Sequence, residues 1–212
     1  MKNDISIRLA TLKDADILHD FHSDIYAREN SFSQAVVSKS DHQIWLNEAL
    51  SDSNRILLLG IDLQSKEPIG LVRVDITDDN YFGEVSINIG AKWRSKKLSV
   101  SLLNKAIDEV GKTHTLVLIA RIIPTNVVSQ KCFQKCGFAL YEENSDELIY
   151  QNKVLVINQI ETVRSKNNVN WMNLMRLAFR VAPKEAEEIF KHINTDDGTI
   201  AMLLNKLTKR FN

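Results

Sequence analysis

Two runs of alternating side chains, at residues 69–77 and 83–90, constrain the fold of this 212-residue chain more than any other feature. Apolar and polar residues alternate in each run, which is the period of a β-strand that buries one face. The residues between the runs, DDNY at 78–81, are turn formers, so the two runs predict a β-hairpin. The apolar face of this hairpin would consist of Val72, Val74, Ile76, Val85, Ile87 and Ile89.

The alternation also predicts the register of the hairpin. If the turn centres on residues 79 and 80, the numbers of facing residues add to 159, so Asp75 faces Glu84 and Arg73 faces Ser86. All four side chains then share the polar face. A purely structural sheet with this face in water would show the same pattern, so the alternation alone does not establish a site.

The remaining elements of the main domain follow from hydrophobic periodicity and from turn residues. In chain order they are a strand at 5–11, a helix at 12–27, a helix at 40–50 with Ser40 as its N-cap, a strand at 55–62, a helix at 95–110, a strand at 113–123, a helix at 125–137, and strands at 138–141 and 147–157. Gly137 suits the left-handed residue that commonly ends a helix. This order predicts a mixed α/β sheet with helices on its faces.

The character of the chain changes near residue 158, which predicts a main domain at 1–157 and an extension at 158–212. The extension begins with a polar segment and continues with three amphipathic stretches, and Pro183 suits the first turn of a helix. Helices this short are marginal alone. We therefore expect a small helical subdomain that packs either on the main domain or on a second copy of the chain, which would form a homodimer.

The charges of the chain argue against broad electrostatic partners. Basic and acidic residues number 27 each, so neither nucleic acid nor an anionic membrane is an expected partner. No apolar run approaches a membrane span and the first residues lack the order of a secretion signal, so we expect a cytoplasmic protein. Arg94, Lys96 and Lys97 nevertheless form a local basic cluster that can hold a compact anion.

The two cysteines, Cys132 and Cys136, are spaced i, i+4 on a predicted helix. This is not the spacing of a Cys-x-x-Cys redox or zinc pair, and no nearby histidine completes a metal site. We expect inert, buried packing thiols and no metal centre.

Residues 94–99, RSKKLS, lead from the predicted hairpin into a helix, and a later segment contains Asn126, Ser129, Phe133, Gly137 and Phe138. These segments resemble two motifs of the GNAT superfamily of acetyl-CoA-dependent N-acetyltransferases. In the first, Gln/Arg-x-x-Gly-x-Gly/Ala, the Arg matches and Lys and Ser replace the two small residues. The second, Asn-x-x-Ser-x-x-x-Tyr/Phe-x-x-x-Gly-Phe, is met in full. The resemblance covers residues 5 to about 155.

The resemblance implies a mixed, mainly antiparallel α/β sheet flanked by helices, with the helical extension outside it. It also implies acetyl-CoA as the cofactor and a small-molecule amine as the acceptor. By this resemblance the residues that contact acetyl-CoA would be Ile89, Arg94, Ser95, Lys96, Lys97, Leu98, Ser99, Asn126, Ser129 and Phe133.

The missing glycines of the first motif need a physical account. A pyrophosphate is held by backbone N–H groups at a helix N-terminus, and any residue supplies an N–H. Glycine is required only where φ is positive or where a Cβ would not fit. If the local torsions are helical, Lys97 and Ser99 are compatible with binding, and a lysine adds a charge-assisted contact. The alternative is a lost or altered cofactor site.

The resemblance places a general base on the strand before the loop, where many relatives carry a glutamate, and Glu84 is the residue there. Asp75 opposite would raise the pKa of Glu84 by like-charge repulsion. Phe133 stands where many relatives have a tyrosine that protonates the departing thiolate. Water, Tyr141 or Tyr150 could fill that role.

For the acceptor, DHQIWL, the Arg73 and Asp75 pair, and EVSINI are similar to GNAT enzymes that acetylate amino-sugar nucleotides in bacterial nonulosonic acid pathways. On this resemblance Arg73 would hold a phosphate, Asp75 would orient hydroxyls, and His42 and Trp45 would meet a sugar or base. Core packing of Trp45 and a surface or capping role of His42 are the alternatives. Other acceptors, such as a protein N-terminus, an antibiotic or a polyamine, and a non-catalytic binding module also remain open.

Overall fold

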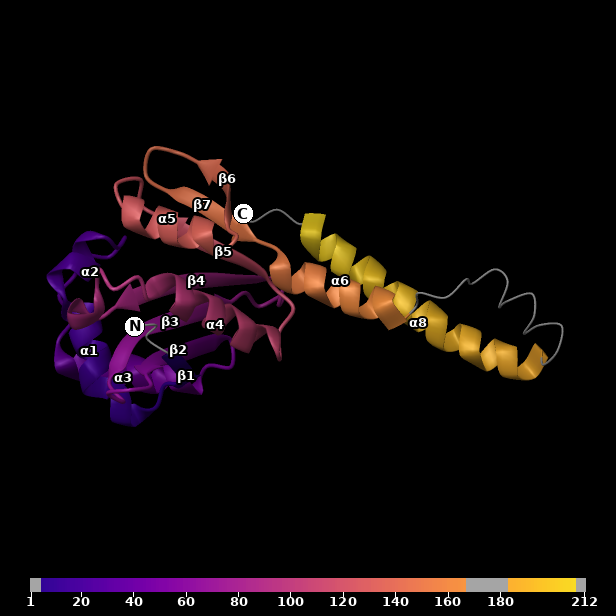
Figure 1. Cartoon of the computed structure of the whole chain (residues 1–212), viewed down its shortest axis with the longest axis horizontal. Coiled ribbons are helices and arrows are strands. Elements are labelled where there is room, and N and C mark those ends of the chain that lie inside the picture. Colours follow the sequence, from indigo (N-terminus) through magenta and orange to yellow (C-terminus); the bar gives the residue numbers. More distant parts are fainter. Residues whose placement is uncertain (1–4, 167–182, 209–212) are drawn as a thin grey trace. The chain divides into compact units, whose positions relative to one another are not determined.

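The computed structural model describes residues 5–166 and 183–208, and the chain forms two compact units, Met1–Asn152 and Lys153–Asn212. Figure 1 labels the elements of both units. The division into domains at 1–157 and 158–212 stays a prediction.

The first unit is built on a seven-stranded sheet with the strand order β1-β2-β3-β4-β5-β7-β6. All neighbouring strands are antiparallel except β4 and β5, which run parallel. The expectation of a mixed, mainly antiparallel sheet is therefore confirmed. The strands are β1 (Ile5–Leu9), β2 (Arg55–Asp62), β3 (Pro68–Ile76), β4 (Phe82–Ile89), β5 (Val117–Ile122), β6 (Ala139–Glu143) and β7 (Leu148–Asn152).

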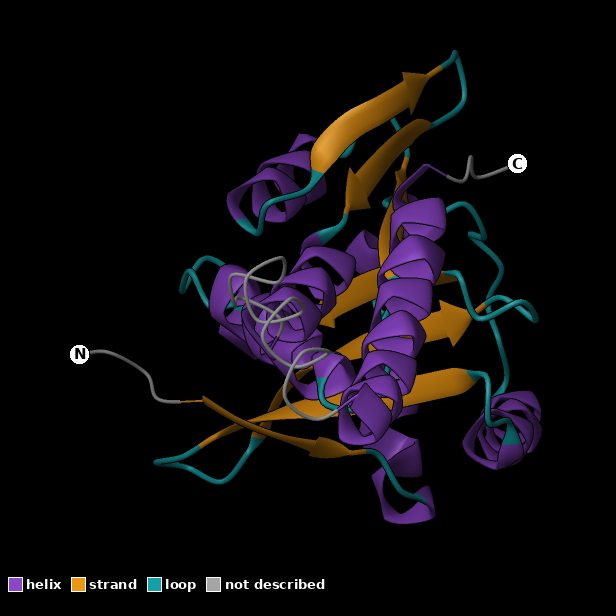
Figure 2. Cartoon of the chain, turned by 90° about the vertical axis from the view of Figure 1, so that its right-hand side faces the viewer, coloured by secondary structure: helices purple, strands orange, loops and turns teal. Residues whose placement is uncertain are grey.

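Helices lie on both faces of this sheet (Figure 2). The helices and 3-10 turns of the first unit are η1 (Leu12–Asp14), α1 (Ala15–Ser23), α2 (Ile25–Glu29), α3 (Lys39–Ser51), η2 (Ala91–Trp93), α4 (Ser99–Gly111) and α5 (Val127–Lys135).

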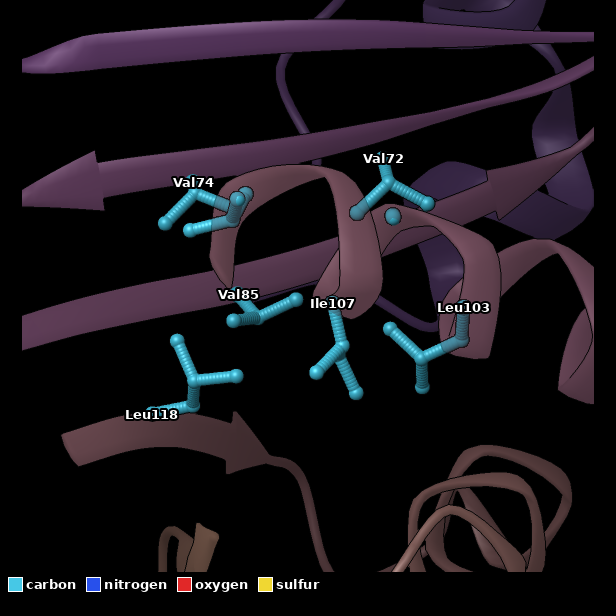
Figure 3. Close-up of a pocket in the computed structure, with 8 residues that line it drawn as sticks. Val72, Val74, Val85, Leu103, Ile107 and Leu118 are labelled. Atoms are coloured by element: carbon cyan, nitrogen blue, oxygen red, sulfur yellow. The ribbon is translucent and has the colours of Figure 1, made fainter. Parts of the chain in front are cut away.

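One face of the sheet packs against α4. Side chains of β3, β4 and β5 meet the apolar side of this helix, and the small gap between them has no room for a water molecule (Figure 3). The residues around the gap are Val72, Val74, Val85, Leu103, Ala106, Ile107, Val110 and Leu118. The predicted core face of the hairpin and the buried face of the helix therefore pack against each other.

The opposite face of the sheet packs against α1 and α3 over its β2 side. Leu57 and Leu59 of β2 lie in one buried cluster with Leu18 and Phe21 of α1 and Leu46 of α3. The polar side chains of the hairpin belong to this same face, because Leu57 pairs with Arg73 across β2 and β3. The cluster thus borders the polar face.

The register predicted for the hairpin is confirmed. Asp75 pairs with Glu84, and Arg73 pairs with Ser86. Gly137 has a φ of 82°, so the predicted left-handed end of the helix before it is confirmed as well.

Two predicted helix starts were wrong. The helix expected at 95–110 begins at Ser99, because Ser95 and Lys97 have φ values of 60° and 59°, which no helix contains. The helix expected from Ser40 is capped by Ser38 instead, whose hydroxyl accepts a hydrogen bond from the Asp41 N–H at 3.1 Å.

Other boundaries also differ from the sequence analysis. The helix expected at 12–27 is interrupted at Asp24, whose ψ of 128° is extended and whose carboxylate caps α2. The strand expected at 147–157 ends at Asn152, and α6 (Val154–Lys166) follows. Val163 is buried with Val156, seven positions earlier, which is a helical spacing that the short apolar run concealed.

The second unit contains α6 and α8 (Pro183–Thr208), which pack against each other. Helix α8 begins at Pro183 as predicted, and the Lys153 ammonium donates a hydrogen bond to the Leu207 carbonyl at 2.7 Å. The amphipathic stretch NWMNLMRLAFRV lies outside the described residues. In the described part of the chain, each helix is too short or too polar to cross a membrane. A homodimer through these helices stays a prediction.

Candidate active site

The candidate site lies where β4 and β5 part. The two strands pair at only three positions, the last of which joins Glu84 to Ile119. Beyond it β4 continues to Ile89 beside β3, and β5 continues to Ile122 beside β7, but β4 and β5 do not pair with each other again in the described residues. Backbone groups at the inner edges of the gap are therefore available to a ligand.

Glu84 is half-buried at this branch point and points to the polar face. Burial raises the pKa of its carboxyl above the ordinary value of a glutamate. The charge of Arg121 opposes this shift and the charge of Asp75 adds to it. Two smaller contributions follow: Arg73 lowers the pKa and Glu147 raises it. A carboxylate with a raised pKa is a stronger base near neutral pH, which suits proton removal from an ammonium group.

Asp75 is neutralised by two arginines. Arg55 Nε donates a hydrogen bond to one of its carboxylate oxygens at 2.6 Å, and Arg73 Nε lies 2.9 Å from the other oxygen. The second contact is an ion pair without hydrogen-bond alignment, because Arg73 Nε has no hydrogen-bond partner in the described residues. Asp75 therefore repels Glu84 less than an isolated carboxylate would, which agrees with its place behind burial among the causes of the raised pKa.

Arg121 completes the polar face on β5, and the sequence analysis missed it. Its Nε donates a hydrogen bond to Glu147 at 2.6 Å, and the ring of Phe32 lies 5.4 Å from its guanidinium carbon. The signal was present, because Arg121 is two residues after Ile119 and shares its face. The long apolar run around it, however, gave no reason to single out one charged residue.

The loop before α4 has a backbone conformation typical of anion-binding nests. Ser95 and Lys97 are left-handed, and Leu98 is right-handed with φ −86° and ψ −22°. Adjacent residues of opposite handedness turn their N–H groups toward one point, which is the geometry of an anion-binding nest. Backbone N–H groups of residues 95–98 have no backbone acceptor in the described residues, and no side chain caps α4. The condition of helical torsions is therefore not met at Lys97, yet these N–H groups remain without a backbone acceptor in the described residues.

The basic residues of this loop differ in availability. Arg94 Nε donates to the Ile89 carbonyl at 3.1 Å, its terminal nitrogen lies 2.5 Å from the Asp24 carboxylate, and its guanidinium lies over the ring of Tyr26. Arg94 therefore braces the loop against α2. Lys96 and Lys97 are exposed, but the Lys96 ammonium lies 4.5 Å from the centre of the Trp93 ring, so Lys97 is the more available cation for an anion at the nest.

The second motif positions α5. Asn126 is buried and caps the helix, since its side-chain oxygen accepts from the Ser129 N–H at 3.1 Å and its nitrogen donates to the Asn30 carbonyl at 3.2 Å. Phe133 is buried with its ring against Phe138. Ligand contacts of Asn126, Ser129 and Phe133 stay predictions.

Two tyrosines were candidates for the proton donor that Phe133 lacks. Tyr141 is exposed on β6, which β7 separates from β5. Tyr150 is buried on β7 opposite Ala120, and its hydroxyl accepts a hydrogen bond from the exposed Gln134 at 3.4 Å. Within the described residues neither hydroxyl has a hydrogen bond to Glu84 or to residues 94–99, so a role for either tyrosine, or for water, stays a prediction.

His42 and Trp45 belong to a ring cluster between α1 and α3. His42 is 4% exposed and lies 5.3 Å from both the His19 and the Trp45 rings, measured between centroids. Trp45 packs on the buried cluster beside it. Contact of His42 and Trp45 with a substrate stays a prediction. The exposed His22 at the end of α1 has a lowered pKa, to which the charge of Arg73 contributes. Burial is the largest cause of the lowered pKa of His22, the charge of His19 is the second, and the charge of Arg73 is the third.

The cysteines are buried and free, as expected of packing thiols. Cys136 donates a hydrogen bond to the Val100 carbonyl of α4 at 3.7 Å, and its thiol lowers the pKa of Cys132 to about 7. Among the described residues no cluster of three ligands could hold a metal ion.

Comparison with known proteins gives a family match. A family model described as an acetyltransferase (GNAT) domain matches residues 4–139, well over half of the chain. A search of curated proteins finds no significant match.

Several solved structures are similar to this chain. A spermidine N-acetyltransferase from Vibrio cholerae, bound to CoA and spermine, is 18% identical with a TM-score of 0.62, over 69% of this chain and 92% of its own. Aminoglycoside acetyltransferase AAC(6')-Ib bound to coenzyme A is 17% identical with a TM-score of 0.58, over 70% and 93%. A protein assigned as a phosphinothricin N-acetyltransferase is 23% identical with a TM-score of 0.61, over 71% of this chain and 99% of its own. These likenesses show a shared fold.

Proposed function

The chain belongs to the GNAT acetyltransferase family, and from this premise we propose that it acetylates a primary amine of an amino-sugar nucleotide. As a member of this family it is an N-acetyltransferase that uses acetyl-CoA. The observation that carries the proposal is Glu84, a half-buried carboxylate with a raised pKa at the point where β4 and β5 part, beside arginine side chains on the same sheet face.

The chain offers acetyl-CoA a donor set that fits its diphosphate. The backbone N–H groups of residues 95–98 supply the cradle, and Lys96 and Lys97 supply positive charge. Arg94 holds the loop in place from behind. When bound, acetyl-CoA supplies an acetyl group activated as a thioester.

Glu84 is the general base of the proposal. An acceptor amine is protonated near neutral pH, and only the neutral amine attacks a carbonyl. Glu84 would take the ammonium proton, directly or through one water. The raised pKa of its carboxyl lowers the free-energy cost of that transfer. Solvent would return a proton to the departing thiolate.

The arginines around Glu84 offer charged contacts to an anionic acceptor. On this face Arg55, Arg73 and Arg121 balance the three carboxylates Asp75, Glu84 and Glu147, so among its described residues no excess of carboxylates is present to attract a polycation. The Arg73 guanidinium is held through Nε, which leaves its terminal nitrogens to contact an anion such as a phosphate. A polyamine acceptor would instead require an excess of carboxylates at this face.

The test is a comparison of acceptors under one assay with acetyl-CoA. We expect a UDP-linked amino sugar to give a kcat/KM at least about tenfold above the same amino sugar without the nucleotide, because charge-assisted contacts contribute about 1.5–3 kcal/mol each. Preference for spermidine would contradict the proposed acceptor. Absence of turnover with every amine would instead indicate a binding module.

A further inference from the structure

We propose that Arg121, held by Glu147 and covered by Phe32, binds a phosphate group of the acceptor and thereby determines acceptor specificity. The inference rests on the proposed function and assigns its substrate-binding contact to residues outside both sequence motifs.

The position of Arg121 relative to Glu84 suits a single small acceptor. Glu84 pairs with Ile119, and Arg121 follows on the same face of β5. One strand spacing across and two residues along place their Cα atoms roughly 8 Å apart. A sugar ring can bridge this distance, with its amine at Glu84 and its anomeric phosphate at Arg121.

The guanidinium of Arg121 is fixed in a way that leaves its outer donors available. Nε donates to Glu147 at 2.6 Å, so one edge is used by the protein. The terminal nitrogens have no hydrogen-bond partner within residues 5–166 and 183–208, and the side chain is 40% exposed. A planar fork with fixed orientation and free terminal N–H groups binds phosphate in a bidentate manner.

The ring of Phe32 covers one face of the Arg121 guanidinium. This ring lies 5.4 Å from the Arg121 guanidinium carbon, although the residue is 54% exposed and comes from the segment between α2 and α3. That segment is held by two contacts, from Asn126 to the Asn30 carbonyl at 3.2 Å and from Arg28 to the Gln34 carbonyl at 3.1 Å. An exposed aromatic ring anchored over a cation lowers the local polarity and strengthens contacts between that cation and an anion.

Phosphate binding at Arg121 would also strengthen the base. Arg121 lowers the pKa of Glu84, against the effect of burial, while Asp75 and Glu147 raise it and Arg73 lowers it. A phosphate that neutralises Arg121 removes its opposing charge, so the pKa of Glu84 rises further when the acceptor is in place. Binding and proton removal would thus be coupled through one side chain.

The test is isothermal titration of UDP, and separately of acetyl-CoA, into the full chain and three variants. For Arg121→Gln we expect UDP affinity to fall at least about tenfold, with acetyl-CoA affinity unchanged within about twofold, because a charged bidentate contact contributes about 1.5–3 kcal/mol. Phe32→Leu should weaken UDP by a smaller factor. Lys112→Gln, which removes one positive charge from an exposed pair with Glu109 on α4, should change neither affinity.

The outcomes separate two failures. If the wild type binds UDP and Arg121→Gln binds it equally well, the inference is overturned and the proposed acceptor class stands. If the wild type binds acetyl-CoA but not UDP, both are overturned. A thermal melt of each variant checks folding. If Arg121→Gln proves unstable, Arg121→Lys is measured in its place: it keeps the charge without the planar fork, so it should bind UDP more weakly than the wild type.

Discussion

The loop at 94–99 and the polar face around Glu84 present donors to a ligand in different ways. The loop offers backbone N–H groups whose direction is set by torsions at Ser95 and Lys97. The face offers side chains whose direction is set by ion pairs, such as Arg121 with Glu147. A site built from backbone N–H groups keeps its donors when the residue type changes, although the new residue can be strained. A site built from side chains loses its donor when that one residue is substituted.

A loop without glycine can still present backbone donors to an anion. A non-glycine residue with positive φ costs about 1–2 kcal/mol, yet it supplies the same N–H as glycine. Lys97 adds a cation that glycine lacks. In this loop Lys97 therefore adds a positive charge at the cost of backbone strain. Glu84 has no such substitute, because its proposed role depends on the carboxylate itself.

Glu84→Gln should show the largest effect, because the amide keeps the shape but cannot accept the proton. We expect kcat to fall by about 10²–10⁴, the usual contribution of a general base. Acetyl-CoA affinity should not change, since the loop is separate from this side chain. Steady-state kinetics with titration of acetyl-CoA measures both. A kcat within about threefold of wild type would exclude Glu84 as the base.

The pH dependence of kcat/KM should come next in size. The carboxylate must be deprotonated to act, so activity should rise with pH through the raised pKa of Glu84. Arg121→Gln removes a charge that lowers this pKa and should move the rise to higher pH. Asp75→Asn removes a charge that raises it and should move the rise to lower pH. Identical profiles for the two variants would contradict the electrostatic account.

Substitution of Lys97 should have the smallest effect, on stability. Lys97→Gly relieves the positive φ and should raise the melting temperature by about 2–4 °C, the shift expected for about 1 kcal/mol in a chain of this size. Lys97→Ala removes the same charge and keeps the strain, so its melting temperature should not rise. Calorimetry of both variants checks this. A higher melting temperature for Lys97→Ala would mean that the charge, rather than the torsion, is the cause.

The sequence predicted the parts of the fold that depend on periodicity. Alternation with a short turn was sufficient to give the register that pairs Asp75 with Glu84. The left-handed torsion of Gly137 was predictable because glycine at a helix end has one common conformation. The same torsion at Lys97 was not, because lysine carries no local signal for positive φ.

Residues of the candidate site could be proposed from the sequence only where they coincided with a motif or an alternating run. Glu84 and the 94–99 loop satisfied that condition, and their roles stay predictions. Arg121 and Phe32 did not, because their contact joins β5 to a segment about ninety residues earlier in the chain. The strand predicted through residue 157 failed for a related reason, since the partner of α6 is α8, far along the sequence.

The most direct test of the account is isothermal titration of acetyl-CoA into the wild-type chain and into Lys97→Glu. The account predicts micromolar binding by the wild type, because the N–H groups of residues 95–98 have no backbone acceptor in the described residues and the exposed Lys97 lies among them. It also predicts at least about tenfold weaker binding by Lys97→Glu, since the substitution reverses a charge beside the anion. No heat of binding with the wild type, or equal affinity in both proteins, would contradict the claim that this loop holds the cofactor.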